Sequence, residues 1–355
     1  MKNIEVEPIW SDSMGAKSLC VKVNTEDTTI VIDPSAALIQ KSYPLDTDKK
    51  YQLLNKAKEK ITKESQEADH VVITHYHYDH HFLPDDEHLD FPKIFTGKKV
   101  WIKNPNEWIN YPQWKRSRKF IRSLMNYKQE KEDITSLDEY EKEPEKKDYE
   151  DPLDELPMLK EIDEGDYSDR REELHKKWRK KFIKRTKMWN DKKPIEEPKN
   201  LEIYFADGKS FTEGNTTVRF TKPLFHGIEY SKTGWVIVVI IENGGEKFLY
   251  TSDVQGPTIE DYAQWIIKEN PDFLIMDGPA TYLLGYMLNN FNLNRSIRNA
   301  VRIVEETDFE TILYDHHVTR EKNFREKTKD FWDAERKILT FREYLEDKPA
   351  LAEEL

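Results

Sequence analysis

The chain has 355 residues, of which 35% are charged, a formal net charge of −12 and a single cysteine, Cys20. One cysteine excludes an internal disulfide and a thiolate metal cluster, so any metal ion must be bound by histidines and carboxylates. The longest apolar run, 235–241, is far shorter than the roughly 20 residues of a membrane span, and residues 1–10 show no secretory signal, so we expect a cytoplasmic protein without a membrane partner.

Residues 1–103 show the pattern of short strands around one amphipathic helix. A β-branched run at 28–32 ends at an Asp-Pro pair, and apolar residues then repeat at helical spacing between residues 54 and 61. The next apolar run, 71–73, is a predicted strand that leads directly into a histidine-rich segment. We interpret this region as the first part of one fold.

Residues 104–200 differ in kind and are predicted to be a charged, largely helical insertion. Nine basic residues and one acid give residues 98–129 a net charge of +8, and ten basic residues and one acid give residues 174–194 a net charge of +9. Both basic stretches repeat apolar residues at helical spacing. Between them, 20 acids and seven bases give residues 130–173 a net charge of −13, and three prolines favour a loop or a mobile cap.

Strand patterns return in residues 201–355, which we interpret as the second part of the fold with C-terminal helices. Helices are predicted near 258–266 and 297–304, and the aromatic residues of the charged tail indicate further helices that cover the core. The predicted strands are short and either apolar or alternating, at 201–205, 217–222, 235–241, 248–251, 273–276 and 311–314.

Three histidines and one aspartate fall within six residues after the strand at 71–73: His75, His77, Asp79 and His80. Neutral imidazole and carboxylate are the ligands that Zn²⁺ and similar ions prefer. A tight loop after a strand would let His75 and His77 bind one ion while Asp79 and His80 bind another. The alternative is a chance cluster of surface histidines, which fits poorly with the apolar strand directly before the motif.

Further ligand-type residues follow other predicted strands or apolar segments along the chain: Asp33, His226, Asp253 and His316. A single residue of this kind is more often a buried polar residue with a structural role. Four such positions in one chain favour a common site at one edge of the sheets.

Taken in this order, the motifs resemble the metallo-β-lactamase superfamily and, more narrowly, a mainly archaeal family within it, uncharacterised protein family 0282. The resemblance implies an α+β fold, a four-layer αββα sandwich formed by residues 1–103 and 201–355 and interrupted by the insertion at 104–200. The superfamily motif is specific for the fold and not for the substrate. The residues that carry the resemblance are Ile32 to Pro34, His75 to His81, Ile109, Asn110, Gln113, Arg116, Pro223, His226, Gly227, Ser252 to Pro257, Asp277 to Pro279, Thr281, Tyr282, Asp315 to His317 and Arg320.

Carried over position by position, the resemblance implies two divalent metal ions, with zinc preferred and manganese or iron as alternatives. Asp253 would bridge the two ions, and Asp33 would orient a ligand without binding metal itself. The remaining ligands would be His75, His77 and His226 for one ion, and Asp79, His80 and His316 for the second.

The mechanism that we expect depends on these ions. Two metals roughly 3.5–4 Å apart can hold a bridging hydroxide at neutral pH, which Asp79 would keep in position. His81, His88 and His317 are candidates for protonating a leaving group, and we select His317, although each of them is more often structural. Arg320 would clamp a phosphate or a carboxylate, and a surface ion pair is its alternative role.

Asn110, Gln113 and Arg116 stand at the start of the insertion. The resemblance favours a substrate-binding role for them, as part of a cap, and a passive arm is the alternative. Whether the insertion binds substrate, a partner or nothing stays open at this point.

Three functions remain compatible with the sequence. The preferred one is a metal-dependent hydrolase with a dinuclear His/Asp site, acting on phosphodiesters of RNA, DNA or nucleotides. The second is a lactonase or thioesterase that uses the same metals, which the overall negative charge suits slightly better. The third is a non-enzymatic protein-docking module with structural metals. The natural substrate, small molecule or nucleic acid, the metal identity and the oligomeric state are not determined by the sequence.

Overall fold

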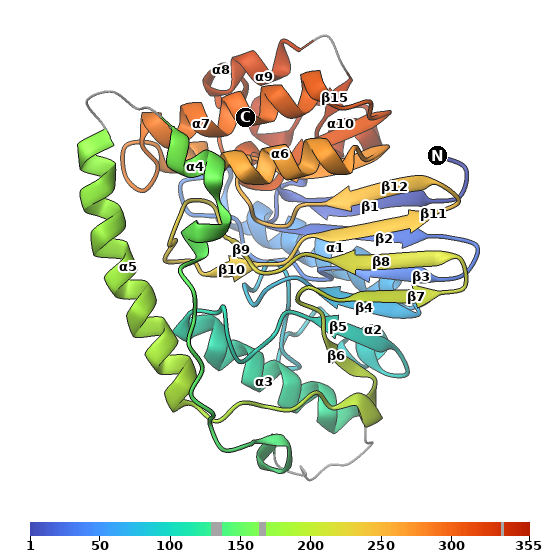
Figure 1. The fold of residues 1–355 in the computed structure, drawn as a ribbon. Helices are drawn as coiled ribbons and strands as arrows, with labels where there is room; N and C mark the ends of the chain where they lie inside the picture. Colours follow the sequence, from blue (N-terminus) through green and yellow to red (C-terminus); the bar gives the residue numbers. More distant parts are fainter. Residues whose placement is uncertain (129–136, 163–167, 335–336) are drawn as a thin grey trace.

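The computed structural model describes residues 1–128, 137–162, 168–334 and 337–355. Two β-sheets lie face to face, with helices on both outer sides (Figure 1). This arrangement confirms the predicted four-layer αββα sandwich with a largely helical insertion. Within these residues, no helix is both long enough and apolar enough to cross a membrane.

The first sheet is antiparallel across its first three strands and parallel across the rest. Its last strand lies after the insertion in sequence and pairs with the strand before it, so the first sheet uses chain from both sides of residues 104–200. In spatial order the strands are β1 (Glu5–Ser11), β2 (Leu19–Asn24), β3 (Thr29–Ile32), β4 (His70–Ile73), β5 (Lys99–Ile102) and β6 (Ile203–Phe205).

In the second sheet, four neighbouring strands at one end run parallel to one another, and the strand pairs at the other end are antiparallel. A separate two-stranded ladder, β9 (Leu224–Phe225) with β10 (Trp235–Val236), lies beside it. In spatial order the strands of the sheet are β15 (Ile338–Leu339), β14 (Thr311–Asp315), β13 (Phe273–Asp277), β12 (Glu246–Tyr250), β11 (Val239–Asn243), β8 (Thr216–Phe220) and β7 (Ser210–Glu213).

The prediction of one continuous strand at 235–241 is wrong. The segment divides into β10 and β11, because β10 pairs with β9 while β11 pairs with β8 and β12. Between the two ladders, the amide of Ile237 donates to the carbonyl of Thr74 at 3.3 Å. The apolar run is buried as expected, but it crosses from one ladder to another beside the histidine motif.

Alternating side chains of β12 divide the core into its two halves. Phe248 and Tyr250 belong to the apolar cluster that contains the residues of the first sheet. Leu249, between them, packs instead with helix residues such as Ile266 and Ile303. Both faces of the central strands β12, β13 and β14 are therefore largely buried, which explains their continuous apolar runs in the sequence, whereas β7 and β8 at the edge alternate.

Helices cover the outer faces of both sheets (Figure 1). The helices on the side of the first sheet are α1 (Thr47–Ser65), α2 (Phe91–Phe95) and α3 (Tyr111–Lys128), and those on the side of the second sheet are α6 (Glu260–Glu269) and α7 (Asn290–Glu306). The predicted tail helices are α8 (Phe324–Lys327), α9 (Lys329–Trp332), α10 (Phe341–Glu346) and α11 (Leu351–Glu354).

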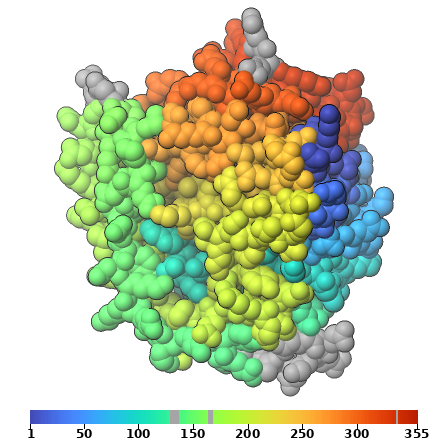
Figure 2. Space-filling view, turned by 45° about the vertical axis from the view of Figure 1, so that its right-hand side comes forward, coloured from blue at the N-terminus to red at the C-terminus, as the bar shows by residue number. Residues whose placement is uncertain are grey.

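The insertion contains the two predicted basic helices, α3 and α5 (Ser168–Asp191). α5 stands along one side of the molecule, next to β9 and β10, and Figure 2 shows the insertion in green along that side. Phe182 and Trp189 of α5 pack against the rings of Trp108 and Trp235. This aromatic cluster attaches α5 to the sandwich.

The acidic stretch between these helices was predicted to be a loop or a cap. Residues 129–136 and 163–167 of this region lie outside the described residues. The rest contains two short 3₁₀ helices, η2 (Leu137–Tyr140) and η3 (Pro152–Glu155), and the short helix α4 (Pro157–Glu161).

Candidate metal centre

The candidate site lies where the loops after β3, β4, β12 and β14 meet. Asp33 follows β3, the histidine motif follows β4, Asp253 lies in the loop after β12, and His316 follows β14. Asp33, Ser252 and His316 have positive φ values of 49°, 51° and 65° without being glycine. A left-handed conformation costs about 1–2 kcal/mol per non-glycine residue. Backbone strain of this kind concentrates at functional sites.

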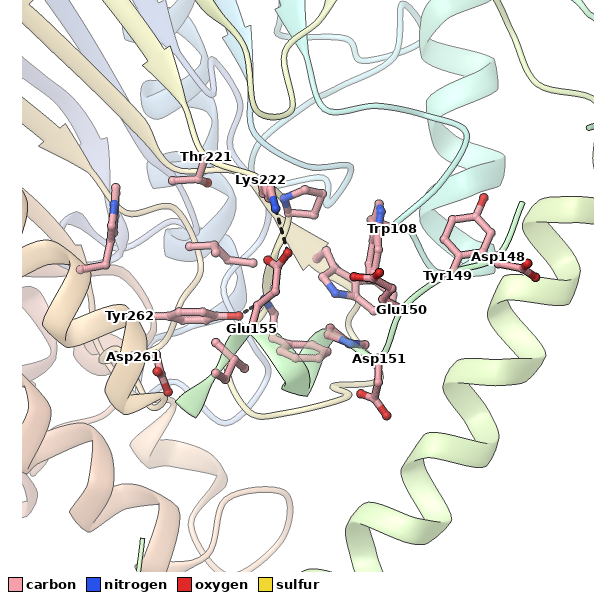
Figure 3. A pocket seen from close by; sticks show the side chains of 17 residues that line it. Trp108, Asp148, Tyr149, Glu150, Asp151, Glu155, Thr221, Lys222, Asp261 and Tyr262 are labelled. Atoms are coloured by element: carbon pink, nitrogen blue, oxygen red, sulfur yellow. Dashed lines mark hydrogen bonds and ion pairs between the residues drawn. The ribbon is translucent and has the colours of Figure 1, made fainter. Parts of the chain in front are cut away.

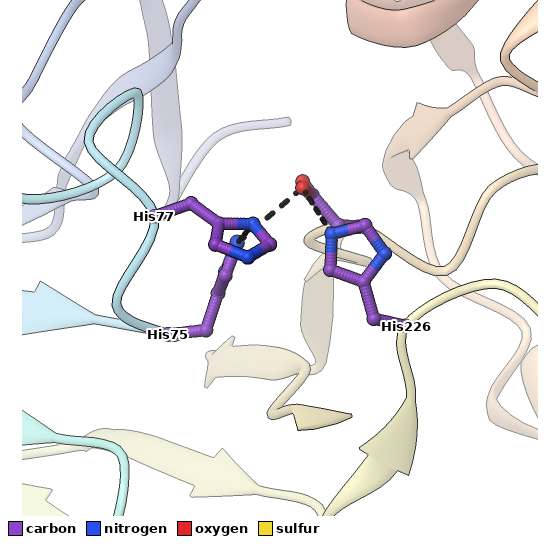
Figure 4. A group of neighbouring side chains, drawn as sticks. His75, His77 and His226 are labelled. Atoms are coloured by element: carbon purple, nitrogen blue, oxygen red, sulfur yellow. Dashed lines mark hydrogen bonds and ion pairs between the residues drawn. The ribbon is translucent and has the colours of Figure 1, made fainter. Parts of the chain in front are cut away.

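Three histidines and one carboxylate form the first ligand group. Oδ2 of Asp253 lies 3.4 Å from Nε2 of His75 and 3.0 Å from Nε2 of His226, and Nε2 of His75 lies 3.0 Å from Nδ1 of His77. Figure 4 shows the three rings around this position. Two ligand atoms about 2.1 Å from a tetrahedral ion stand about 3.4 Å apart, so the spacing suits an ion of the size of Zn²⁺.

The second ligand group lies on the other side of the same carboxylate. Oδ1 of Asp253 is 3.1 Å from Nε2 of His80 and 3.3 Å from Nε2 of His316. Oδ2 of Asp79 is 3.9 Å from Nε2 of His316. One carboxylate therefore faces both groups, with one oxygen toward each, and the seven residues with predicted ligand roles come together in two adjoining groups that could hold metal.

The donor atoms also suit a metal ion because several of them lack a hydrogen-bond partner. Both oxygens of Asp253, Nε2 of His80 and Nε2 of His226 are buried without a hydrogen-bond partner among the described residues. Leaving such an atom unpaired in the interior costs about 1–3 kcal/mol. Four of them converging on one place indicate a site for a ligand, and imidazole nitrogens with carboxylate oxygens suit a divalent cation.

The electrostatics of the two groups differ. Burial lowers the pKa of His75 to about 4, so its imidazole is neutral as metal ligation requires. Although burial opposes the charged form of His80, Asp253 and Asp33 raise its pKa to about 10. The negative charges of Asp253 and Asp33 also favour a metal cation in this second group.

Two buried carboxylates orient the histidines of the second group. Oδ2 of Asp33 lies 2.8 Å from Nδ1 of His80, as the orienting role predicts. Oδ1 of Asp12 lies 2.8 Å from Nδ1 of His316. Sequence reasoning missed Asp12, whose only local signal is its position directly after β1. Carboxylates of this kind fix the ring orientation and raise the basicity of a ligating histidine.

His317 is also held by a carboxylate, but it faces the cleft and not the second ligand group. Its Nδ1 lies 2.9 Å from Oδ1 of Asp277, which directs Nε2 away from Asp277, and the residue lines the cleft described below. Burial and the neighbouring Arg320 hold the pKa of His317 well below its usual value. Burial and Asp253 also raise the pKa of Asp277 well above its usual value, so His317 and Asp277 form a buried pair that can share a proton, and Nε2 of His317 is the nitrogen directed away from Asp277.

Arg320 is buried at the floor of the site. Its Nε forms an ion pair with Asp12, and its Nη2 lies 3.3 Å from Oδ2 of Asp79. Nη1 donates to the hydroxyl of Tyr282 at 3.2 Å. The alternative of a surface ion pair is wrong, because Arg320 is only 4% exposed. It connects the carboxylate that orients His316 to the Asp79 carboxylate.

The predicted substrate-binding residues at the start of α3 lie behind the histidine motif. Gln113 is fully buried, accepts from the amide of Tyr76 at 3.1 Å and lies 3.3 Å from Nε2 of His77. Asn110 donates to the carbonyl of Thr233 at 2.8 Å, and Arg116 donates to the carbonyl of Tyr76 at 3.2 Å. These contacts position the motif, and direct contact of the three residues with substrate stays a prediction.

The two other candidate proton donors lie away from the cleft. His81 is buried and its Nδ1 contacts the carbonyl of His77 at 2.8 Å. His88 lies in a turn next to Asp86, beside a separate surface hollow. His317 is thus the candidate among the three that reaches the cleft.

A cleft of about 590 Å³ opens over the metal-ligand residues. Its walls come from the loop after β9, the segment 280–288 and helix α5, so the insertion contributes to it. The residues that decide its character are His77, Asp79, His226, His317 and Arg320 on the floor, and Lys17, Lys177, Trp178, Lys181, Lys232, Tyr286 and Met287 on the walls.

A second cavity, of about 660 Å³, is lined by residues of β9 and β10 and by part of the insertion (Figure 3). None of the candidate metal ligands lines it. Asp151 and Glu155, two of the carboxylates there, already have partners in Arg179 and Lys222. The chemistry of the site therefore belongs to the smaller cleft.

Comparison with known proteins gives the family. No family model matches the chain. The chain is 30% identical over 351 residues to a UPF0282 protein of Korarchaeum cryptofilum, covering 98% of this chain and 90% of the relative. It is 31% identical over 331 residues to a UPF0282 protein of Methanocaldococcus jannaschii, covering 91% and 87%.

Among solved structures, the chain is similar to the metallo-β-lactamase fold protein YhfI from Bacillus subtilis, with 14% identity, a TM-score of 0.40 and coverage of 96% and 97%. It is also similar to Igni18, a metallo hydrolase from Ignicoccus hospitalis, with 12% identity, a TM-score of 0.39 and coverage of 95% and 94%. On the sequence relatives and its own sheet topology, the chain belongs to the UPF0282 family and has the metallo-β-lactamase fold.

Proposed function

We propose that the protein is a metal-dependent hydrolase with a dinuclear centre. The observation that carries this proposal is the position of Asp253, whose two oxygens face two separate groups of histidines. His75, His77 and His226 would hold one ion, and Asp79, His80 and His316 the other. When bound, two divalent ions supply Lewis acidity and lower the pKa of water to about 7.

Asp79 is the acidic group that would position the attacking water. It lines the cleft and is 14% exposed on its side chain. Although burial opposes its ionisation, His80, His316 and Arg320 hold the pKa of Asp79 well below its usual value. An ionised Asp79 can accept a hydrogen bond from water and direct a lone pair of that water toward the substrate.

His317 would move the proton. The His317–Asp277 pair can take a proton from the attacking water and then donate it to the leaving oxygen through Nε2 of His317. This sequence requires no proton from bulk solvent. It adds the acceptance of a proton from water to the role of protonating the leaving group that the sequence suggested for His317.

The charge of the cleft favours a phosphodiester as substrate. Five cationic side chains line it, from Lys17, Lys177, Lys181, Lys232 and Arg320, against the two carboxylates of Asp79 and Glu229. The second of these carboxylates is already paired with Arg295 at 2.7 Å. A positive cleft in a protein of net charge −12 stabilises a substrate that stays anionic through the transition state.

The two alternatives are less well supported. A lactone or a simple thioester would leave most of these cations without a partner, although an anionic carrier on a thioester could use them. A structural metal site is closed by its protein ligands, whereas His77, Asp79 and His226 line an open cleft. This arrangement favours catalysis over a purely structural role.

The test is a substrate panel on protein reconstituted separately with Zn²⁺, Mn²⁺, Co²⁺ and Fe²⁺. Hydrolysis of bis(p-nitrophenyl) phosphate is expected to exceed that of simple lactones and thioesters, and Asp79→Ala is expected to abolish it. Asp85→Ala, at an exposed position outside the site, is the matched control. Efficient lactone or thioester hydrolysis without phosphodiester hydrolysis would select the second function, and inactivity on all substrates would select the third.

A further inference from the structure

Two walls of the cleft carry side chains that the metal centre does not use. One wall is α5, which contributes Lys177, Trp178 and Lys181. The other includes Tyr286 and Met287 in the segment 280–288, which are 85% and 59% exposed. Large apolar side chains exposed together at the mouth of a cleft mark a surface for ligand contact.

Two lysines of α5, Lys177 and Lys181, line the cleft, whereas the other lysines of that helix do not. Lys177 and Lys181 are four residues apart, so they lie on one face, and neither forms an ion pair with any residue in the described parts of the chain. By contrast, Lys176 pairs with Glu172 at 2.7 Å and Arg179 pairs with Asp151 at 2.8 Å. The face of α5 toward the cleft therefore presents two lysines that no acid of the described residues neutralises, and their position at the cleft distinguishes them from the other unpaired lysines of the helix.

A further unpaired cation lies close to the metal centre. Lys17 lines the cleft near Asp79 and Arg320 and has no ion pair within the described residues. Lys17 is only partly exposed, and a lysine that loses hydration without gaining a partner weakens folding. Its placement is explained if an anionic ligand supplies the missing partner.

We propose that the cleft binds a nucleotide unit with two phosphates. The scissile phosphodiester lies over the metal-ligand residues, near Lys17 and Arg320, and the second phosphate binds Lys177 and Lys181. The base packs against Trp178 and Tyr286, because aromatic side chains stack on any base with about 1–3 kcal/mol each. This inference rests on the proposed function only for the place of the scissile phosphate.

The volume of the cleft limits how large a bound nucleotide can be. A volume of about 590 Å³ falls within the roughly 300–1,000 Å³ of small-molecule sites. It suits one or two nucleotides and not a duplex. The same chemistry is offered by a free dinucleotide and by the end of a single strand, so the experiment must separate these two sources.

The experiment measures binding by calorimetry, independently of turnover, with adenosine 3′,5′-bisphosphate as the probe on metal-loaded protein. The double variant Lys177→Ala/Lys181→Ala is expected to lower the affinity at least tenfold. Lys180→Ala/Lys184→Ala, which removes two exposed lysines of α5 that do not line the cleft, is expected to leave it unchanged. Tyr286→Ala is expected to lower the affinity several-fold, with Tyr51→Ala, 50% exposed on α1, as its control.

Equal losses in the two double variants, or no binding by the wild-type protein at low salt, would overturn the proposal. Hydrolysis of bis(p-nitrophenyl) phosphate by wild-type protein that does not bind the bisphosphate would reject this inference alone. Binding without hydrolysis would reject the proposed function alone. A dinucleotide that binds as tightly as a 20-nucleotide single strand identifies a free nucleotide as the ligand, and tighter, salt-dependent binding of the strand identifies a strand end.

Discussion

Oδ1 of Asp12 lies 2.8 Å from Nδ1 of His316, although 304 positions separate the two residues in the chain. Asp12 also pairs with Arg320, so one buried carboxylate serves both a candidate metal ligand and the cation beside it. The relationship joins the end of β1 to the end of β14. It makes the second ligand group dependent on both sheets.

Asp12→Asn should weaken metal binding in the second group. Asparagine keeps the size of the side chain but removes the charge that holds the imidazole of His316, and losing such a partner typically costs 10–100-fold in metal affinity. Zinc titration with a competing chelator measures the effect. Asp207→Asn, which removes a carboxylate paired with Lys103 outside the site, should leave both affinities unchanged, and equal losses in the two variants would contradict the assigned role.

The adjacent histidines His316 and His317 should behave differently. Nε2 of His316 faces Asp253 at 3.3 Å, whereas His317 is tied to Asp277 and directs Nε2 elsewhere. His316→Ala should therefore lose one metal ion per chain by elemental analysis. His317→Ala should keep the metal content and lower turnover by about 10²–10⁴-fold, the usual contribution of acid–base catalysis. The reverse pattern would show that the ligand was misassigned.

Arg320→Ala should destabilise the metal-free protein strongly. The variant leaves the carboxylates of Asp12 and Asp79 without their cation, and breaking a buried ion pair in this way costs about 3–5 kcal/mol. Denaturant unfolding monitored by circular dichroism measures the loss. Arg325→Ala, which removes two partly exposed ion pairs with Glu343 and Glu353, should cost only about 1 kcal/mol or less. Similar losses in both variants would argue against a structural role for Arg320.

The stability of the fold should rise with pH in an alkaline window because of Lys98. Burial lowers the pKa of Lys98 to about 8, whereas an unfolded lysine titrates near 10.4. Between these values the unfolded chain binds more protons than the folded chain, so raising the pH favours folding. Lys98→Met should flatten this part of the pH profile of unfolding. If the pH profile of Lys98→Met matches that of the wild-type protein, the rise in stability at alkaline pH does not come from Lys98.

Much of the site could be predicted because its chemistry is local in sequence. His75 to His80 form a contiguous motif after an apolar strand, and Asp33 ends a predicted strand and belongs to the Ile32 to Pro34 match, so these residues could be selected as candidates, and the structure brings them together. Asp12 carries no such signal, because the segment before it, 5–11, was not predicted to be a strand and is not among the residues that carry the resemblance. Its role arises only when β1 and β14 come together in the folded protein.

The parts that could not be predicted depend on which way side chains face. The net charge of +9 over residues 174–194 was visible in the sequence, but not that Lys177 and Lys181 face the cleft while Arg179 pairs with Asp151. The apolar run at 235–241 gave no indication of the break between β10 and β11. Only pairing with two different ladders creates that break.

The metal content tests the central claim most directly. Protein purified without a histidine tag and reconstituted with Zn²⁺, Mn²⁺ or Fe²⁺ should contain two metal ions per chain by elemental analysis. Asp253→Ala, which removes the carboxylate that faces both ligand groups, should lower the occupancy of both positions. Metal content near zero after reconstitution, or full occupancy in Asp253→Ala, would contradict the account.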